Sequence, residues 1–254
     1  IVDVPTAVYF HENQITYPSV GRTRAETALG MVNWSAVLAA DGSAFNSGFH
    51  RSAFFDALPG FLGASPDRRH GHLIPAAVER AAVVPVGVDL ARIGPLRERS
   101  GPATFLWNHR WDPDKDPPAA LAAFGELAAR GHDFRVVLAG EPFVDQHEEH
   151  RDAIETLGDR VVSLGYLDEA SYVETLHAAD AVVSTALQEF FGVSVVEAMY
   201  AGALPILPDR LVYPERVPAG MDGDCLYRTP RQLVDRLAAV AADLSSSQIS
   251  IRIR

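Results

Sequence analysis

Short apolar runs alternate regularly with segments of helical spacing along the second half of the chain. Apolar and β-branched runs between turn residues predict buried strands, at 103–108, 134–139, 160–163, 181–184, 204–207 and 225–227. Apolar residues spaced three and four apart predict helices between these strands, at 118–130, 145–157, 169–178, 193–201 and 230–244. This alternation is typical of a complete Rossmann-like domain built around a parallel sheet.

The first half of the chain shows the same alternation with fewer strands. Strands are predicted at 6–10, 43–45 and 83–89, with one helix at 22–40 and another opening after Asn46 or Ser47, either of which is a suitable N-cap. A doubly wound domain usually has about five or six strands, so we expect the chain to begin partway through its N-terminal domain. The polar, proline-containing stretch 95–102 is the predicted linker. The expected organisation is an incomplete N-terminal domain at 1–95, a C-terminal domain at 96–244 and a tail at 245–254.

Composition and charge narrow the class of protein. With 254 residues and 48% hydrophobic content, a soluble globular protein is expected. No apolar run approaches the roughly 20 residues that cross a bilayer, and the N-terminus has no signal-peptide pattern. A single cysteine, Cys225, favours a reducing, cytoplasmic setting. The net charge of −11 repels polyanions, so a nucleic-acid substrate would need a local basic patch, for which Arg68, Arg69, His70 and His72 are the candidates.

A polar loop between the predicted strand 181–184 and the predicted helix 193–201 carries the clearest chemical signal. Ligands of open α/β sheets bind at the carboxyl ends of strands, where the N-terminus of a helix favours anions. Glu189 lies in this loop and Glu197 about two turns into the helix, so two carboxylates flank one helix start. The alternative for this pair alone is an acid near the helix dipole and a solvated helix residue.

The two glutamates, with seven residues between them and Phe-Gly shortly after the first, resemble the donor site of retaining GT-B glycosyltransferases of family 4. Further segments narrow this resemblance to the tRNA-queuosine α-mannosyltransferases, in register from about residue 7 to 237; they are 8–14, 17–18, 45–47, 108–111, 114–117, 189–192 and 211–215. The resemblance implies an α/β protein of GT-B fold with two Rossmann-like domains, the N-terminal one incomplete. Members of this family carry a further N-terminal stretch and a C-terminal segment beyond about residue 244 that are absent here.

The resemblance also implies a set of site residues. The sugar of the donor would be held by Glu189 and the backbone at Phe190, Phe191 and Gly192, and its ribose by Glu197. The donor side would further include Gly140 and Tyr166, which follow two of the predicted strands. The catalytic set would consist of His11, Arg110, Lys115 and Glu189, and the acceptor side of Glu12, Asn13 and Gln14.

Arg110 and Lys115 follow the first strand of the C-terminal domain, and the resemblance assigns both to the donor diphosphate. Fixed cations stabilise the negative charge of a departing diphosphate, so a metal-independent reaction is expected. Surface ion pairs with Asp112, Asp114 and Asp116 are the alternative. His147 and His150 suggest a metal site only weakly, because no third ligand is in view. No dinucleotide-binding glycine pattern and no phosphate-binding P-loop occurs, so no cofactor is expected.

The resemblance implies a retaining hexosyltransferase that moves mannose from GDP-mannose, a nucleotide-sugar, onto queuosine in tRNA, and a cytoplasmic location is expected. Two alternatives remain open at this point. The same chemistry could serve a lipid, glycan or small-molecule acceptor, or the chain could be a catalytically silent module that binds a nucleotide-sugar or tRNA. The sequence does not indicate an oligomeric state.

Overall fold

The computed structural model describes residues 4–17, 24–64, 70–140 and 146–246, and the chain divides into two compact units. The first unit contains residues 1–87 together with the short segment 188–191, and the second contains 88–187 and 192–254. Segment 88–102 belongs to the second unit because Ile93 is buried there and Arg99 donates to the carbonyl oxygens of His177, Ala201 and Gly202. The linker predicted from the sequence lies within this segment.

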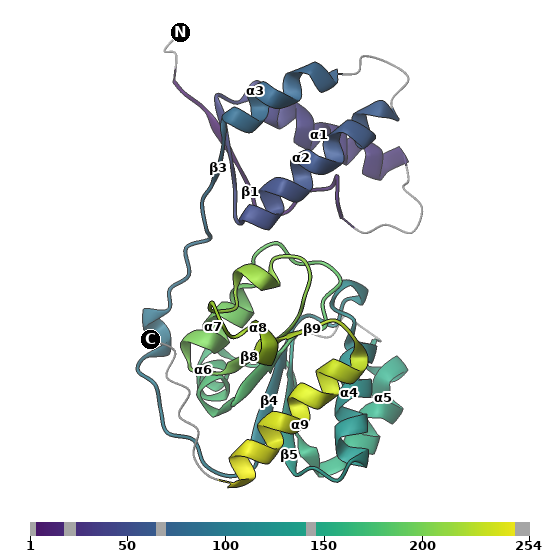
Figure 1. Ribbon diagram of the computed structural model, residues 1–254, viewed down its shortest axis with the longest axis vertical. Helices are drawn as coiled ribbons and strands as arrows, with labels where there is room; N and C mark the ends of the chain where they lie inside the picture. The colour runs from purple at the N-terminus through teal and green to yellow at the C-terminus, as the bar shows by residue number, and fades with distance from the viewer. Residues whose placement is uncertain (1–3, 18–23, 65–69, 141–145, 247–254) are drawn as a thin grey trace. The chain divides into compact units, whose positions relative to one another are not determined.

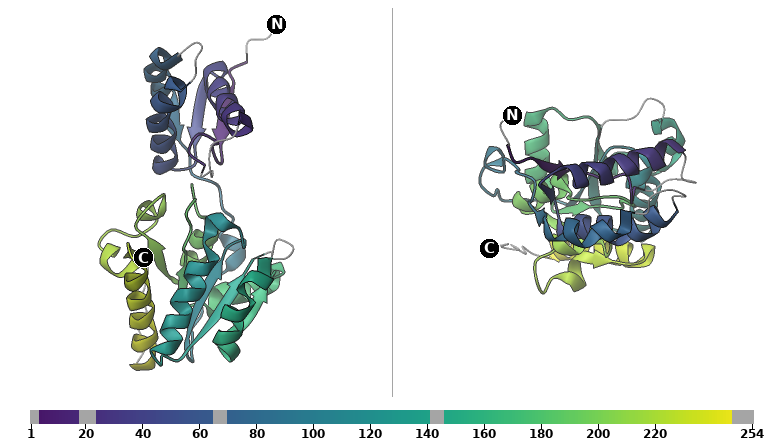
Figure 2. Two further views of the ribbon diagram at one scale, coloured as in Figure 1. Left: turned by 90° about the vertical axis from the view of Figure 1, so that its right-hand side faces the viewer. Right: turned by 90° about the horizontal axis from the view of Figure 1, so that it is seen from above.

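The first unit is built on a three-stranded parallel sheet in the order β1-β2-β3. Its strands are β1 (Ala7–Phe10), β2 (Gly42–Phe45) and β3 (Ala81–Val83). The helices are α1 (Arg24–Ala39), α2 (Gly48–Gly63), η1 (His70–Leu73) and α3 (Ile74–Glu79). Right-handed crossovers that advance in one direction place successive helices on one face, and Figures 1 and 2 show α1, α2 and α3 on the same side of this sheet.

The core of the first unit lies between that sheet and its helices, where Phe10, Phe45, Phe54 and Trp34 are buried. Ser47 is the N-cap of α2, as predicted, and its Oγ accepts a hydrogen bond from the His50 N–H at 3.0 Å. The third strand was predicted too late in the chain, because β3 begins at Ala81 and ends at Val83, and the N–H of Val84 just after it donates to the Phe45 carbonyl oxygen at 2.8 Å.

The second unit contains a six-stranded parallel sheet in the order β6-β5-β4-β7-β8-β9. Its strands are β4 (Ala103–Asn108), β5 (Phe134–Ala139), β6 (Val161–Gly165), β7 (Ala181–Val183), β8 (Leu204–Pro208) and β9 (Leu226–Tyr227). The α-helices are α4 (Pro117–Ala129), α5 (Gln146–Leu157), α6 (Glu169–Ala178), α7 (Val193–Tyr200), α8 (Asp222–Cys225) and α9 (Pro230–Ser246). Short 3-10 turns occur at Ala91–Ile93 (η2), Pro113–Lys115 (η3), Gly158–Arg160 (η4) and Tyr213–Glu215 (η5).

Helices cover both faces of the second sheet. Figure 1 shows α4, α5 and α9 side by side over one face, with α6 and α7 on the other. The main core lies under α4 and α9, where Phe105, Trp107, Phe124 and Leu237 are buried. Both layers are required because every residue of β4 and β7 is buried, which is usual for central strands of a parallel sheet.

The predicted elements of the second unit are observed with small shifts at their ends. One assignment was wrong: Cys225 ends the short helix α8 instead of beginning β9. Residue 145, where the second of the predicted helices was to begin, lies outside the described residues, as do 247–254 of the predicted tail and Arg68 and Arg69 of the candidate basic patch. Within the described ranges, no helix is both long and apolar enough to span a membrane.

The strand order of the second unit reverses between β4 and β7. β4 leads outward through β5 to β6, whereas β7 leads outward through β8 to β9. The connections after β4 and β7 therefore lead in opposite directions across the sheet, and ligands of open α/β sheets bind at such a reversal. These are the loops that carry the predicted diphosphate cations and the glutamate pair.

Candidate functional site

The loops after β4 and β7 are tied together by hydrogen bonds. Thr185 Oγ1 lies 2.7 Å from the Lys115 carbonyl oxygen and accepts from Trp107 Nε1 at 3.2 Å. The N–H of Leu187 donates to the Asp114 carbonyl oxygen at 2.7 Å. The backbone that carries Lys115 is thus fixed against the loop that leads to Glu189.

Glu189 folds back on its own loop. Its Oε1 accepts hydrogen bonds from the N–H groups of Phe190 at 3.1 Å and Phe191 at 3.2 Å. These are the amides that the sequence analysis assigned to the donor sugar. A sugar hydroxyl that bound them would take over contacts now made by the Glu189 carboxylate.

Gly192 begins α7 in the left-handed conformation, with φ of 80° and ψ of 54°. Residues with a Cβ adopt this conformation only at a cost, so glycine is favoured here. Its carbonyl oxygen accepts the first helical hydrogen bond, from Val196 N–H at 3.0 Å. The turn positions the helix that carries Glu197.

Glu197 is buried on α7, and both of its carboxylate oxygens are engaged. Oε2 accepts a hydrogen bond from the Tyr172 hydroxyl at 2.9 Å, and Oε1 accepts a charged hydrogen bond from the Arg92 guanidinium. The pKa of Tyr172 is raised by burial and by the neighbouring Glu197 charge, so the phenol stays protonated and acts as the donor. Sequence reasoning missed both partners, since neither belongs to a motif and both lie far from Glu197 along the chain.

The two predicted diphosphate cations each lie next to an acid. Arg110 pairs with Asp112 at 3.0 Å, and Lys115 pairs with Asp114 at 3.2 Å, as the alternative interpretation anticipated. The Arg110 side chain is 60% exposed and that of Lys115 only 12%. An exposed ion pair is worth little, so the Arg110 guanidinium can turn to an incoming anion at small cost. Lys115 is the only lysine in the chain.

Gly140 and Tyr166 follow β5 and β6. Gly140 has a φ of +148°, and a Cβ at this position would lie 2.0 Å from the His109 carbonyl oxygen. Its N–H donates to the Gly165 carbonyl oxygen at 3.0 Å, which joins the ends of the two strands. Tyr166 is 70% exposed and is available to a ligand.

The predicted acceptor-side residues belong to the loop after β1 in the first unit. His11 and Glu12 are exposed, and Glu12 accepts from Gln14 Nε2 at 3.1 Å. Asn13 is fully buried, and its Oδ1 accepts from the N–H groups of Ile15 and Thr16 at 3.0 Å and 2.9 Å. Asn13 therefore shapes the loop, and His11 and Glu12 are the members of the set that solvent reaches most readily.

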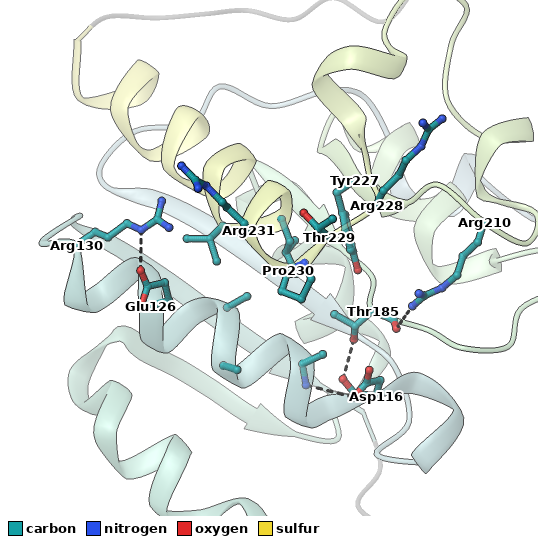
Figure 3. Close-up of a pocket in the computed structure, with 15 residues that line it drawn as sticks. Asp116, Glu126, Arg130, Thr185, Arg210, Tyr227, Arg228, Thr229, Pro230 and Arg231 are labelled. Atoms are coloured by element: carbon teal, nitrogen blue, oxygen red, sulfur yellow. Dashed lines mark hydrogen bonds and ion pairs between the residues drawn. The ribbon is translucent and has the colours of Figure 1, made fainter. Parts of the chain in front are cut away.

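A cavity of about 450 Å³ lies between α4 and α9 in the second unit (Figure 3). Its lining combines apolar side chains of these helices with polar and charged side chains, and none of the predicted site residues lines it. Arginines at its rim are paired with acids: Arg130 with Glu126 at 2.9 Å and Arg228 with Asp209 at 2.6 Å. Arg210, which also lines the cavity, donates to the backbone carbonyl oxygens of Ala186 and Thr185. Since the cavity contains none of the predicted site residues, the loop that carries Glu189 remains the candidate site.

Metal ligands do not cluster in the part of the chain that the structure describes, where no group of three or more His, Cys, Asp or Glu side chains is arranged to hold an ion. The side chains of His147, Glu148 and Glu149 fall outside the described residues.

Two family models match the chain. Residues 1–88 match the model described as tRNA-queuosine alpha-mannosyltransferase N-terminal, and residues 92–249 match the model described as glycosyl transferases group 1. The first match confirms the resemblance inferred from the sequence. The second covers the six-stranded sheet and all the loops of the candidate donor site.

Two curated relatives are longer proteins than this chain. It is 34% identical over 241 residues to the tRNA-queuosine alpha-mannosyltransferase of Drosophila melanogaster, covering 91% of this chain and 63% of that protein. It is 28% identical over 135 residues to the GDP-mannose:cellobiosyl-diphosphopolyprenol alpha-mannosyltransferase of Xanthomonas campestris, covering 52% of this chain and 36% of that protein. The chain therefore spans less than two thirds of the length of either relative.

The fold is also found in solved structures. Anabaena HepE, solved in complex with UDP and glucose, superposes with a TM-score of 0.66 at 17% identity, over 96% of this chain and 62% of that one. This similarity confirms the expected GT-B α/β architecture. Since the group 1 model matches more than half of its residues, the chain belongs to the glycosyl transferases group 1 family.

Proposed function

We propose that this protein is a retaining mannosyltransferase that moves mannose from GDP-mannose onto queuosine in tRNA. The observation that carries the proposal is the start of α7, where Glu189 and Glu197 flank a left-handed glycine at the reversal of strand order. Nucleotide ligands bind in this position of open α/β sheets. The match of residues 1–88 to the tRNA-queuosine mannosyltransferase model supports the acceptor.

The donor would lie across the carboxyl ends of the strands. Glu197 accepts hydrogen bonds from the ribose hydroxyls, and Glu189 with the amides after it orients the sugar. Gly140, at the tight end of β5, and the exposed Tyr166 border the nucleotide. GDP-mannose is supported by the name of the Xanthomonas relative, which states that donor, and mannose by the name of the Drosophila relative.

The reaction proceeds by front-face substitution. The bond from the anomeric carbon to the diphosphate oxygen breaks while the acceptor hydroxyl oxygen bonds to that carbon from the same side, so the configuration is retained. The departing diphosphate takes the acceptor proton and leaves as GDP. Arg110 and Lys115 stabilise its developing charge, and the fixed loops reduce the entropy cost of alignment. These cations make a metal ion unnecessary in the proposed mechanism, and no cofactor takes part.

His11 and Glu12 receive the acceptor in this proposal. Both side chains are exposed after β1, at a strand end suited to ligands. Gln14 supports Glu12 through the hydrogen bond from its Nε2. A tRNA acceptor also favours a cytoplasmic location for the reaction.

A different acceptor is the second candidate. The Xanthomonas relative is named for a diphosphopolyprenol acceptor, so donor chemistry of this kind serves lipid-linked substrates as well. The chain's net charge of −11 is unfavourable for a polyanionic tRNA. A lipid, glycan or small-molecule acceptor, or a module that binds without turnover, is therefore an explicit outcome of the test.

The test incubates the full-length protein with GDP-mannose and queuosine-containing tRNA, and weighs the digested nucleosides by mass spectrometry. We expect a hexose on queuosine, and loss of transfer in Lys115→Ala and Glu189→Ala while the fold is retained. Arg97→Ala is the matched control, because Arg97 forms an exposed ion pair with Glu174 and neither is a predicted site residue. Transfer at the wild-type rate in either site variant would overturn the assigned roles.

Different outcomes would reject the acceptor assignment and the donor assignment. GDP release without hexose on queuosine would retain the donor site and reject tRNA. Acylation of Lys115 is read by mass spectrometry from the peptide that contains this residue. Failure of GDP to protect Lys115 from acylation would contradict its contact with the diphosphate.

A further inference from the structure

A directed chain of hydrogen bonds connects β4 to Glu197. Asn108, at the carboxyl end of β4, donates from Nδ2 to the Ser194 carbonyl oxygen at 3.0 Å and to the Tyr172 hydroxyl at 3.1 Å. A carbonyl oxygen only accepts, which fixes the orientation of the Asn108 amide. The Tyr172 hydroxyl then donates its own hydrogen to Glu197 Oε2.

Arg92 donates to the other carboxylate oxygen of Glu197. It belongs to η2, in the segment 88–102, and its guanidinium donates to Glu197 Oε1 and reaches Glu169 at 3.5 Å. Glu169 is largely exposed, whereas Glu197 is buried. A buried carboxylate needs a hydrogen-bonded counter-charge, and Arg92 supplies it.

The group formed by Glu197, Tyr172, Arg92 and Asn108 has hydrogen-bond acceptor positions that no donor fills among the described residues. An ionised carboxylate offers about four lone-pair positions, and Arg92 and Tyr172 use one on each oxygen of Glu197. The buried Asn108 Oδ1 has no hydrogen-bond partner among the described residues. Acceptors that lack donors match a ligand bearing O–H groups, such as a vicinal diol, and do not match a phosphate, which brings acceptors.

We propose that Tyr172 and Arg92 are positioning residues that hold the Glu197 carboxylate in place for the two ribose hydroxyls of the nucleotide-sugar. This inference rests on the proposed function, in which Glu197 binds ribose. A glutamate side chain has three rotatable bonds, so an unheld carboxylate must be ordered when the ligand binds. Two donors from different elements, α6 and the segment 88–102, order it beforehand.

A purely structural role makes a different prediction. If these hydrogen bonds only braced α6 and α7 against β4, their loss would weaken the binding of every nucleotide equally. If they position Glu197, the loss affects only ligands with ribose hydroxyls. The discriminating measurement is therefore the preference for a nucleotide with both hydroxyls over its 2′,3′-dideoxy analogue.

The experiment measures the binding of GDP and 2′,3′-dideoxy-GDP by calorimetry, with the matching uridine pair in parallel. We expect the wild type to prefer GDP by about tenfold, the factor that about 1.4 kcal/mol represents. Tyr172→Phe removes one hydroxyl and keeps the ring. It should weaken GDP binding by about tenfold, leave the dideoxy analogue unchanged and so abolish the preference.

Arg92→Gln tests the second donor in the same way, and Arg92→Lys should restore part of the preference because it keeps the charge. Two control variants change residues of the same elements for which no contact with Glu197 is described. Tyr200→Phe changes an exposed tyrosine on α7, and Arg97→Gln changes an arginine of the same segment whose ion pair is exposed. Both should bind like the wild type, with thermal unfolding as the check that each variant is folded.

The outcomes separate the two levels of the argument. A wild type that binds neither pair, or shows no preference within either, overturns the ribose role of Glu197 and this inference with it. A wild type with the preference and a Tyr172→Phe variant that keeps it overturns only the positioning role. Equal loss for GDP and its dideoxy analogue also overturns that role, in favour of a structural brace.

Discussion

His50 is held neutral by its surroundings in the first unit. Its Nδ1 lies 2.8 Å from Asn46 Oδ1, and Asn46 Nδ2 donates to the His11 carbonyl oxygen, so the hydrogen must be on Nδ1. Nε2 is buried without a hydrogen-bond partner in the described part of the chain. Burial lowers the pKa of His50 to about 4. Sequence patterns located the N-cap Ser47 beside it but indicated nothing about this histidine.

A depressed histidine pKa makes the folded protein less stable in acid. The unfolded chain takes up a proton near its ordinary pKa of 6.5, and the folded chain does so only near 4. Stability from this residue is therefore full above pH 6.5 and falls by about 1.4 kcal/mol per pH unit down to pH 4. Urea unfolding at pH 7.5 and 5.5 should show this loss in the wild type.

The matched variant for that measurement is His50→Gln, which cannot be protonated. It should be less stable at pH 7.5 because a buried contact is lost, and its stability should fall less between the two pH values. A parallel fall in both proteins would show that His50 does not titrate as described. His72→Gln, a change at an exposed histidine, should follow the wild type.

At the scale of elements, close approach of two loops depends on one glycine. The Cβ of any other residue at Gly140 would lie 2.0 Å from the His109 carbonyl oxygen and 2.8 Å from its carbon, and the φ of +148° disfavours side chains as well. His109 belongs to the loop after β4, which carries Arg110. The sequence placed Gly140 at a strand end, but the clash with His109 follows only from the packing of β4 beside β5.

Gly140→Ala should therefore destabilise the second unit and displace the loop after β4 that carries Arg110. We expect a loss of more than about 2 kcal/mol in the free energy of unfolding, with weaker GDP binding. Gly125→Ala is the control, since Gly125 lies within α4 and a Cβ there meets nothing within 4 Å. It should stabilise the protein by about 0.5–1 kcal/mol. Equal stability of Gly140→Ala and the wild type would disprove the clash.

At the scale of the whole molecule, a single thiol can report the opening of the second unit. Cys225, the only cysteine, is buried in the second unit, and burial raises the pKa of its thiol to about 11. A thiol reagent at pH 8 meets almost no thiolate and no exposed sulfur in the folded state. Labelling of Cys225 therefore reports opening of the second unit.

GDP should slow this labelling if it binds the second unit. At a concentration about 100 times its Kd, a ligand that binds only the folded state stabilises that state by about 2.7 kcal/mol. The labelling rate should then fall about a hundredfold where reclosure is faster than the reagent. Guanosine, which lacks the diphosphate, should protect less. Undiminished labelling under saturating GDP would place the nucleotide elsewhere.

The sequence by itself determined the elements and the family. Strand and helix periodicities are local, so they survive without knowledge of the partners, and the spacing of Glu189 and Glu197 marks one helix start whatever surrounds it. Short elements were the failures: α3 and α8 were missed, and Cys225, the last residue of α8, was assigned to β9. Six or fewer residues carry too little periodic signal.

Only the tertiary structure decided which distant residues meet. The fold brings Tyr172 and Arg92 to Glu197 and Asn108 to Tyr172, although no motif links these residues. Packing likewise buried Asn13, which sequence reasoning had turned toward the acceptor. The physical reason is that side-chain contacts between elements depend on register, crossover hand and burial, and these are properties of the assembled sheet that no local pattern contains.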